Sequence, residues 1–523
     1  MNQSRYSPGM HMTTEGQPSA PILQRTTPPL WLAALQITAL ATHWPLTLLI
    51  GPTRAVANAA SVILLCGLMA LAANLLYVIM LQLGVPGWKA LGWASLGILL
   101  FWHINGLGAD LLIPSWMLQA VLFTLVLTAA GRLADHRYMK VGMLAGSLTL
   151  GGTLAVSALV AAVTTPPPVV GAQQSVRDFT FQTQPDIYLV VLDGYARSDV
   201  IEQIFGYDNA PFETALSESG FEVYSEATAN YPITHFSIPS LLNMSYMHGD
   251  QGPISNADLS KLAENIAGNN AVVRTVKANG YQYLHGETIS QYNRCGDQVD
   301  FCLNGPFLDM TMYRLLQNTP IGALFYSATA DPATWLNIQR IDQMRDWKSV
   351  ERVLGRGPKF TFLHLILPHP PLFLDRDCQM RFDPDLRGSE MIRDDIPADR
   401  QDKRHAAWVE QIECANRATL DFIEQLEDDD VLIVTADHGS DATYRLFGDV
   451  GQYTADDLAE RMPIFTAARV PQTCRGEIPE DVALVNLFRY VFACLADEAP
   501  DPLPDRTFVA SFEGYIIEVK SPD

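Results

Sequence analysis

The sequence predicts a membrane-embedded bundle of five helices followed by an α/β domain whose sheet is doubly wound and mainly parallel. Apolar stretches dominate the first 163 residues, whereas short apolar runs alternate with helical patterns from residue 185 onward. Strands separated by helices favour a parallel sheet with helices on both faces. A chain of 523 residues is also long enough to form more than one structural unit.

Charge is divided unevenly between the two parts. Seven of the 35 basic residues and three of the 57 acidic residues lie before residue 164, which leaves 28 basic and 54 acidic residues in the remainder. Such an acidic surface repels nucleic acid, so a phosphate ligand has to be captured locally by a metal ion or a few donors. We therefore expect no nucleic-acid partner.

Five apolar stretches are about 20 residues long or longer, enough for helices to cross a hydrocarbon core. They lie at 31–50, 57–81, 90–107, 111–130 and 141–163. If residues 1–29 form a cytoplasmic tail, six basic residues lie on the cytoplasmic side and only Arg54 lies outside, as the positive-inside rule requires. Five crossings then give a multi-pass protein of the inner membrane with a periplasmic domain. If the third stretch, which contains His103 and Asn105, does not cross, the large domain is cytoplasmic instead.

Cysteine usage agrees with an extracytoplasmic domain. Cys66 lies within an apolar stretch, and the other six cysteines, an even number, follow residue 163. This distribution suits disulfides in an oxidising compartment, and proximity in sequence favours a bridge between Cys295 and Cys302. The alternative is six reduced thiols in the core.

Residues 164–184 form an extended stalk around three consecutive prolines, and a single domain is expected from 185 to 523. We expect its strands at 187–192, 221–224, 281–284, 360–367 and 431–435, and helices at 211–219, up to residue 279, and at 404–426. Ligands of such sheets bind beyond the carboxyl ends of the strands, so the residues that follow each strand are the candidates for chemistry.

Two strand ends carry metal-ligand side chains. Asp193 follows the first strand, and Asp437 and His438 follow the strand at 431–435. Two carboxylates and an imidazole suit one Zn²⁺ or Mn²⁺ ion better than Mg²⁺ or Ca²⁺, with a hydroxyl as fourth ligand. Alone, each motif is weak, because Asp-Gly is usually a turn and Asp-His-Gly can be a helix cap.

The candidate hydroxyl belongs to Thr234, which we expect to be the N-cap of a helix. A helix N-terminus favours an incoming phosphate and an ionised oxygen. The alternative is that Thr234 only caps the helix, while Ser237 and Ser240 point elsewhere. Asn230, at the start of the same loop, is a candidate substrate contact.

Two histidines accompany the strand at 360–367. His369 lies just past it and is placed to contact a phosphate oxygen or protonate a leaving group. His364 lies inside the strand, where a buried core histidine is the more common outcome, and it is our third candidate for substrate binding.

The order Asp-Gly, Thr loop-helix, His-x-x-x-x-His-Pro and Asp-His-Gly resembles the alkaline phosphatase and sulfatase superfamily. The likeness is greatest to its membrane-anchored branch, the lipoteichoic acid synthases and lipid A phosphoethanolamine transferases, which also have five N-terminal helices. Their motif Thr-x-x-Ser-x-Pro-Cys is matched by Thr234, Ser237 and Pro239, with Ser240 in place of the cysteine. This resemblance implies an alkaline phosphatase-like fold, a nucleophilic Thr234, metal ligands at Asp193, Asp437 and His438, and a phosphate contact at His369.

Two departures narrow the expectation. Arylsulfatases convert the Cys or Ser of C/S-x-P-x-R to formylglycine, but Thr234 and Ile238 occupy the positions of that residue and of the arginine. No histidine follows His438, so a second metal ion would lack a ligand that two-metal relatives have.

The leading hypothesis is a transferase that moves a phosphorylated head group from a membrane phospholipid to an envelope glycan or lipid. Tethering raises the effective concentration of a lipid donor. The alternatives are a tethered phosphodiesterase or phosphatase that uses water, and an inactive domain that binds an envelope polymer.

Overall fold

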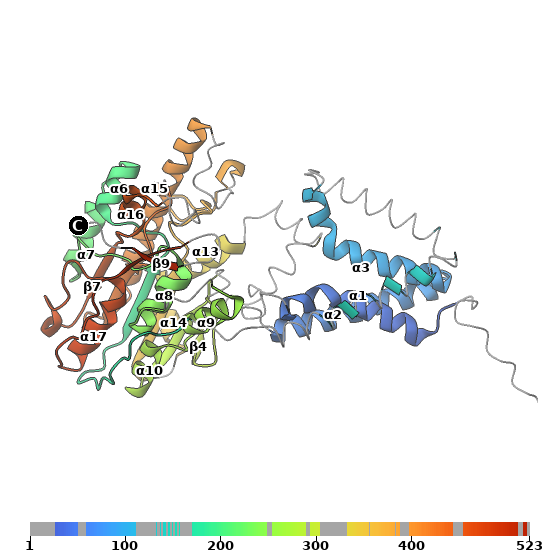
Figure 1. Ribbon diagram of the computed structural model, residues 1–523, viewed down its shortest axis with the longest axis horizontal. Coiled ribbons are helices and arrows are strands. Elements are labelled where there is room, and N and C mark those ends of the chain that lie inside the picture. Colours follow the sequence, from blue (N-terminus) through green and yellow to red (C-terminus); the bar gives the residue numbers. More distant parts are fainter. Residues whose placement is uncertain are drawn as a thin grey trace, which may run out of the picture. The chain divides into compact units, whose positions relative to one another are not determined.

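Figure 1 shows the computed structural model of the chain. The structure describes residues 27–50, 59–110, 170–247, 254–288, 293–303, 332–354, 356–381, 383–386, 397–442, 453–510 and 516–519. It also describes residue 319 and scattered positions between 132 and 156. The chain divides into two compact units, residues 1–44 with 66–155 and residues 45–65 with 156–523. We call the second of these the larger unit.

Three long apolar helices occupy the N-terminal part. They are α1 (Leu30–Ile50), α2 (Ala59–Gln82) and α3 (Gly87–Asp110), close to the first three predicted stretches. In the part of the chain that the structure describes, one segment, Val62–Gln82, is long and apolar enough to cross a membrane, with a mean hydropathy of 2.5. Stretch 111–130 and most of 141–163 lie outside the described residues, so the five-helix bundle stays a prediction.

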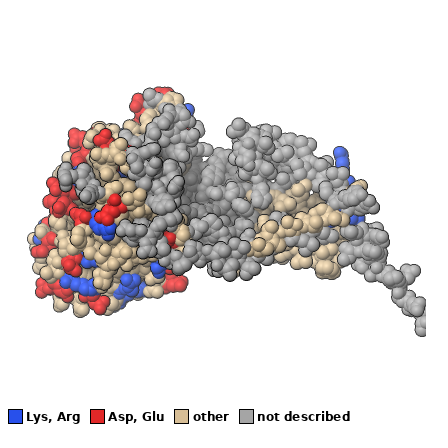
Figure 2. All heavy atoms as spheres, viewed as in Figure 1, with Lys and Arg blue, Asp and Glu red and all other residues tan. Residues whose placement is uncertain are grey.

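Polar side chains join these helices to one another. Gln36 of α1 donates to the Ser95 hydroxyl of α3 at 2.9 Å, and Asn74 of α2 donates to the Thr38 hydroxyl of α1 at 3.2 Å. Leucines of α2, among them Leu71, which is 67% exposed, point away from the other helices. Figure 2 shows almost no charged side chain on the described surface of these helices, whereas Asp and Glu are spread over the visible face of the larger unit. Interhelical hydrogen bonds beneath an apolar exterior suit helices surrounded by lipid.

The larger unit contains a seven-stranded sheet in the order β2-β7-β6-β1-β5-β3-β4 (Figure 1). Its strands are β1 (Ile187–Leu192), β2 (Glu222–Val223), β3 (Gln282–Gly286), β4 (Phe301–Cys302), β5 (Lys359–Leu365), β6 (Val431–Ala436) and β7 (Thr466–Arg469). The five adjacent strands β6, β1, β5, β3 and β4 run parallel to one another, which confirms the mainly parallel α/β sheet. The antiparallel strand β7, and the pairing of β2 with it, were not predicted. A separate two-stranded antiparallel sheet pairs β8 (Thr507–Ala510) with β9 (Ile516–Val519).

Helices cover both faces of this sheet. One group consists of α6 (Ser198–Phe205), α7 (Ala210–Glu218), α13 (Pro332–Arg345), α14 (Trp347–Glu351) and α15 (Ala398–Ile423). The other consists of α8 (Thr234–Asn243), α9 (Asn256–Ile266), α10 (Ala271–Ala278) and α17 (Leu487–Leu495), and α16 (Ala455–Arg461) precedes β7. Tyr188 of β1 packs edge-on against Trp347, whereas Phe360, the register partner of Ile187, packs against Phe488 of α17. Because successive side chains of a strand point to opposite faces, these contacts place the two groups on the two faces.

Three disulfides join the six cysteines of the larger unit. They are Cys295–Cys302, as predicted, Cys378–Cys414 and Cys474–Cys494. The alternative of six reduced core thiols is therefore wrong. Bridges of this kind are typical of oxidising compartments.

Candidate active site

Three central strands end at the same level of the sheet. Leu192 of β1 is paired with Leu365 of β5 and with Ala436 of β6. The residues that follow, Asp193 and Asp437, therefore project from neighbouring positions at the carboxyl edge. Gly194, with φ of 72°, turns the chain directly after Asp193 and donates its N–H to Asp437 Oδ1 at 3.1 Å.

Asp193, Asp437 and His438 form a buried cluster with one ligand atom from each within 4.8 Å of the others. His438 Nε2 lies 3.3 Å from Asp437 Oδ2 and 3.7 Å from Asp193 Oδ1. Two carboxylate oxygens, Asp193 Oδ1 and Asp437 Oδ2, are buried and have no hydrogen-bond partner among the described residues. Buried anionic oxygens are costly unless they are neutralised, so two such atoms beside one imidazole fit a bound cation.

The surrounding groups keep this cluster in a form that suits a metal ion. His438 Nδ1 lies 3.0 Å from the carbonyl oxygen of Gly439, which can only accept, so Nδ1 carries the proton and Nε2 presents its lone pair to the carboxylates. Burial, followed by the Arg461 guanidinium, lowers the pKa of His438 well below its ordinary value. Burial, and then the Asp193 carboxylate, raise the pKa of Asp437 to about 6. A divalent ion would offset the repulsion between the two carboxylates.

Thr234 places its hydroxyl at this cluster. Its Oγ1 lies 3.2 Å from His438 Nε2. The predicted N-cap position is wrong by one residue: Ile233, with φ of −140° and ψ of 138°, is the N-cap, and Thr234 is the first residue of α8. No side-chain bond caps this helix, so the hydroxyl is not used for capping. The hydroxyls of Ser237 and Ser240 are turned away and donate to the carbonyls of Tyr231 and Ser245.

His369 stands beside the same cluster on the loop after β5. Its ring centre is 6.2 Å from that of His438, and its backbone N–H donates to the Asp193 carbonyl at 3.1 Å. Nδ1 donates to the Pro370 carbonyl, which leaves Nε2 as the nitrogen for other contacts. Burial lowers the pKa of His369, but the carboxylates of Asp193 and Asp441 outweigh burial and raise it above its ordinary value. A half-buried imidazolium next to the cluster can donate a proton or bind an anion.

His364 lies behind Asp193. It is fully buried, and its Nε2 is 3.2 Å from Asp193 Oδ2. The amide of Asn293 donates to His364 Nδ1 at 3.2 Å, so the ring proton is on Nε2, facing the carboxylate. Although burial favours the neutral acid, His369 and then His364 hold the pKa of Asp193 below its ordinary value. His364 therefore orients Asp193, as expected of a buried histidine, and no part of it reaches solvent.

Asn230 is directed elsewhere. It is 3% exposed, its amide N–H donates to the Arg506 carbonyl, and its Oδ1 accepts the Val485 N–H. These bonds tie the loop before α8 to the turn that precedes α17 and to the residue that precedes β8. We leave Asn230 out of the proposed site because its amide is already committed to the backbone.

A family model described as Sulfatase matches residues 185–477, more than half of the chain. The chain belongs to the sulfatase family. It is an enzyme of the alkaline phosphatase superfamily, which agrees with the resemblance carried by its motifs. No curated protein matches the chain significantly.

The solved structures to which this sulfatase-family chain is similar are distant from it in sequence. The C-terminal periplasmic domain of EcEptC from Escherichia coli is 11% identical, covers 68% of this chain and 96% of its own, and has a TM-score of 0.37. The corresponding domain of the phosphoethanolamine transferase EptC from Campylobacter jejuni is 10% identical (62% and 97% covered, TM-score 0.38). The phosphonate monoester hydrolase SpPMH from Silicibacter pomeroyi is 14% identical (62% and 79% covered, TM-score 0.39). The family assignment rests on the sulfatase match.

Two residues that sequence reasoning missed also adjoin the cluster of this sulfatase-family domain. Arg461, at the end of α16, has its Nη2 3.2 Å from His438 Nε2. Glu460 accepts hydrogen bonds from the Ser440 hydroxyl at 2.7 Å and the Ala442 N–H at 2.6 Å. A basic residue in the last turn of a helix is ordinary, so the sequence around Arg461 carries no signal that separates it from a surface residue.

Metal affinity of this centre is expected to depend on pH. Because the pKa of Asp437 is about 6 in the metal-free protein, a proton competes with the metal ion below that pH. Zinc affinity should be nearly constant above pH 7 and fall by up to about tenfold per unit below pH 6, the slope for one proton. Competition with a chelator across pH 4.5–8 measures this, and affinity that rises on acidification would contradict it.

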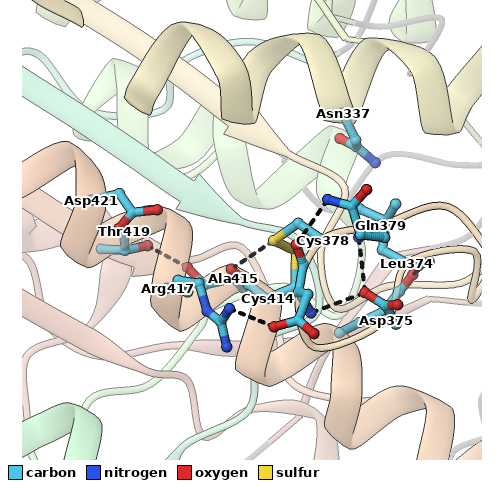
Figure 3. Close-up of a disulfide and its surroundings, with 12 residues drawn as sticks. Asn337, Leu374, Asp375, Cys378, Gln379, Cys414, Ala415, Arg417, Thr419 and Asp421 are labelled. Carbon is cyan, nitrogen blue, oxygen red and sulfur yellow. Dashed lines mark hydrogen bonds and ion pairs between the residues drawn. A yellow bond between two sulfur atoms is a disulfide. The ribbon is translucent and has the colours of Figure 1, made fainter. Parts of the chain in front are cut away.

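The loop that carries His369 is braced by α15. Gln411 of α15 donates to the Pro368 carbonyl at 3.0 Å and accepts the Leu374 N–H at 3.1 Å. Figure 3 shows the Cys378–Cys414 disulfide joining the same loop to this helix, with Arg417 one turn further along it. The loop is thus held to the helix at both ends.

Removing this disulfide is expected to affect activity as well as stability. Cys378→Ser with Cys414→Ser should lower the free energy of unfolding by about 2–4 kcal/mol, because a bridge across 36 residues restricts the unfolded chain. Turnover should also fall, because His369 loses its brace. Cys474→Ser with Cys494→Ser is the matched control, expected to lower stability with little change in turnover. Denaturant unfolding and steady-state kinetics separate the two, and equal turnover in both variants would contradict the role of the brace.

Proposed function

We propose that this enzyme is a membrane-anchored, metal-dependent phosphotransferase that works through a phosphorylated Thr234. The observation that carries the proposal is the Thr234 hydroxyl, 3.2 Å from His438 Nε2 at the first turn of α8. A threonine cannot provide the formylglycine of arylsulfatases, but it can act as an oxygen nucleophile towards phosphorus. The reaction that fits the site best is therefore phosphoryl-group transfer.

Asp193, Asp437 and His438 are the residues that would hold one divalent ion, with Zn²⁺ or Mn²⁺ favoured by the ligand set. When bound, such an ion supplies Lewis-acid polarisation of a phosphate oxygen and lowers the pKa of a neighbouring hydroxyl. His438 is held by the Gly439 carbonyl, and Asp193 is held by His364. These contacts keep the ligand atoms in place, as the outer contacts of metal ligands commonly do.

The proposed reaction has two steps, in which Thr234, His369 and the first turn of α8 each take part. Thr234 gives up its hydroxyl proton to solvent, and its Oγ1 forms a bond to phosphorus while the bond from phosphorus to the leaving alcohol breaks. His369, whose Nε2 faces away from its Pro370 contact, gives a proton to that alcohol. The backbone N–H groups at the start of α8 favour the phosphate charge. An acceptor alcohol then gives its proton to the now neutral His369 and forms a bond to phosphorus, while the bond from phosphorus to Thr234 Oγ1 breaks and Oγ1 takes back a proton from solvent. The two displacements retain the configuration at phosphorus.

The apolar N-terminal helices support a lipid donor and an envelope acceptor. Val62–Gln82 is long enough to span a bilayer, and tethering favours a phospholipid over a soluble phosphate ester. We place residues 185–523 outside the inner membrane, in agreement with the three disulfides among them. The acceptor on this proposal is the hydroxyl of an envelope glycan or lipid.

The test uses the full chain purified in detergent with zinc and phospholipids labelled in the head group. We expect a phosphorylated Thr234-containing peptide by mass spectrometry, and diacylglycerol as the released product. Adding a candidate glycan or lipid acceptor should discharge the enzyme and carry the label. Label found only in a water-derived product would instead favour a tethered hydrolase, and absence of both adduct and turnover would sink the proposal.

A further inference from the structure

Arg461 lies between the two loops that carry the reactive groups. It is the last residue of α16, and only 1% of it is exposed. Its Nε donates to the Pro232 carbonyl at 2.8 Å, two residues before Thr234. Its Nη1 donates to the carbonyls of Gly439 and Ser440, at 2.9 and 3.2 Å, directly after His438. One guanidinium thus bonds both loops.

The segment around Arg461 also fixes the metal-ligand loop through its backbone. The Gly439 N–H donates to the Arg461 carbonyl at 2.7 Å. A Cβ atom at Gly439 would come within 2.2 Å of the Glu460 carbonyl oxygen, so only glycine fits there. The side chain of Glu460 accepts from Ser440 and Ala442 on the same loop. This loop is therefore held against the end of α16, and Arg461 extends that hold to the loop before α8.

We propose that Arg461 is a positioning residue that sets the distance between the Thr234 hydroxyl and His438 Nε2. The inference rests on the proposed function, because it assigns those two atoms to nucleophile and metal ligand. A planar guanidinium with several donors in fixed directions can bond carbonyls on two loops at once. A lysine ammonium carries the same charge, but all its N–H donors are on one nitrogen, so it reaches only one of the two loops. A methionine of similar length reaches neither.

Two measurable consequences separate positioning from general packing. Without the guanidinium, the Thr234 loop and the His438 loop move independently, so a metal ion would lose the alignment of its ligands. Loss of such outer contacts lowers metal affinity by about 10–100-fold. The lost alignment also slows phosphorylation of Thr234, whereas loss of packing alone lowers only stability.

Arg489 provides a matched control. It is 4% exposed, and its guanidinium bonds two backbone carbonyls, those of Met244 and Asp501, each at 2.8 Å. Met244 follows the opposite end of α8 from Thr234. Arg489→Met therefore removes a buried arginine of the same kind from a different pair of segments.

The experiment compares Arg461→Met, Arg461→Lys and Arg489→Met in the full chain purified in detergent. Zinc affinity is measured by chelator competition, ligand geometry by the visible spectrum of the Co²⁺-loaded protein, and stability by the unfolding midpoint. We expect Arg461→Met to bind zinc about 10–100-fold more weakly with an altered Co²⁺ spectrum, Arg461→Lys to be intermediate, and Arg489→Met to match the wild type in both. Arg461→Lys keeps the test open if Arg461→Met does not fold.

The inference is overturned if Arg461→Met, or Arg461→Lys where the methionine variant is unfolded, binds zinc with wild-type affinity and spectrum. It is also overturned if Arg489→Met loses zinc affinity equally. Wild-type protein that binds no divalent metal would overturn the proposed centre itself, which distinguishes failure of the proposed function from failure of this inference.

Discussion

Replacing Thr234 with alanine is expected to reduce turnover by about 10⁴-fold or more, the range seen when a catalytic nucleophile is removed. The hydroxyl lies 3.2 Å from His438 Nε2 and does not cap its helix, so its removal should leave the fold intact. Zinc should still bind through Asp193, Asp437 and His438, with lower affinity because a fourth ligand is lost. The phosphorylated peptide should vanish in mass spectra.

Ser237→Ala is the control for this prediction. Ser237 lies one turn along the same helix, and its hydroxyl donates to the Tyr231 carbonyl, away from the cluster. Removal of that buried hydrogen bond should cost about 1 kcal/mol of stability and leave the phosphorylated adduct detectable. Thr234→Ser should retain part of the activity because it keeps the hydroxyl. Wild-type turnover in Thr234→Ala would rule out the covalent route.

The sequence was informative where function depends on strand ends. Asp193 and Asp437 each follow a continuous apolar run, and the rule that parallel sheets bind ligands at their carboxyl edge was enough to bring them together. The register of β1 with β5 and β6 bears out that reasoning. His369 was found in the same way, because it follows the neighbouring strand.

Contacts between segments far apart in sequence could not be predicted in this way. Asn230 has the right residue type, but its amide is engaged by Val485 and Arg506, more than 250 residues away. The antiparallel direction of β7 is set by its pairing with β6, which no local pattern encodes. Arg461 contacts Pro232 from 229 positions away. Local sequence thus predicted the groups at the strand ends, while the residues that hold them in place emerged only from the packing.

Asp437→Asn is expected to have opposite effects on stability in the absence and presence of zinc. The metal-free wild type carries a carboxyl whose pKa is raised to about 6 by burial and then by Asp193, so its ionisation opposes folding as pH rises from about 4 to 6. Above pH 6 this opposition amounts to about 3 kcal/mol, since each unit of pKa corresponds to about 1.4 kcal/mol. Asparagine has no such charge and can still accept the N–H groups of Gly194 and His438. At pH 7.5 the metal-free variant should therefore be more stable than the metal-free wild type.

Zinc should reverse that order. A zinc site with four ligands contributes about 10–16 kcal/mol, so the loss of one anionic ligand should weaken binding by about 100-fold or more. At a zinc concentration that saturates the wild-type site, the metal ion therefore stabilises the wild type far more than the variant. The unfolding midpoints of the wild type and of Asp437→Asn, each measured at pH 7.5 with chelator and with zinc, test this reversal.

Asp430→Asn controls for the burial of a carboxyl without a metal. Asp430 immediately precedes β6, at the end opposite Asp437, and burial raises its pKa to about 7. Its replacement should be stabilising above pH 7 by a similar amount whether or not zinc is present. A reversal with zinc that occurs only at Asp437 would tie the raised pKa of this residue to a metal site, because burial alone acts equally at both ends of the strand. If Asp437→Asn were destabilising under both conditions, its carboxylate would be a structural hydrogen-bond acceptor, and the metal centre would have to be sought elsewhere.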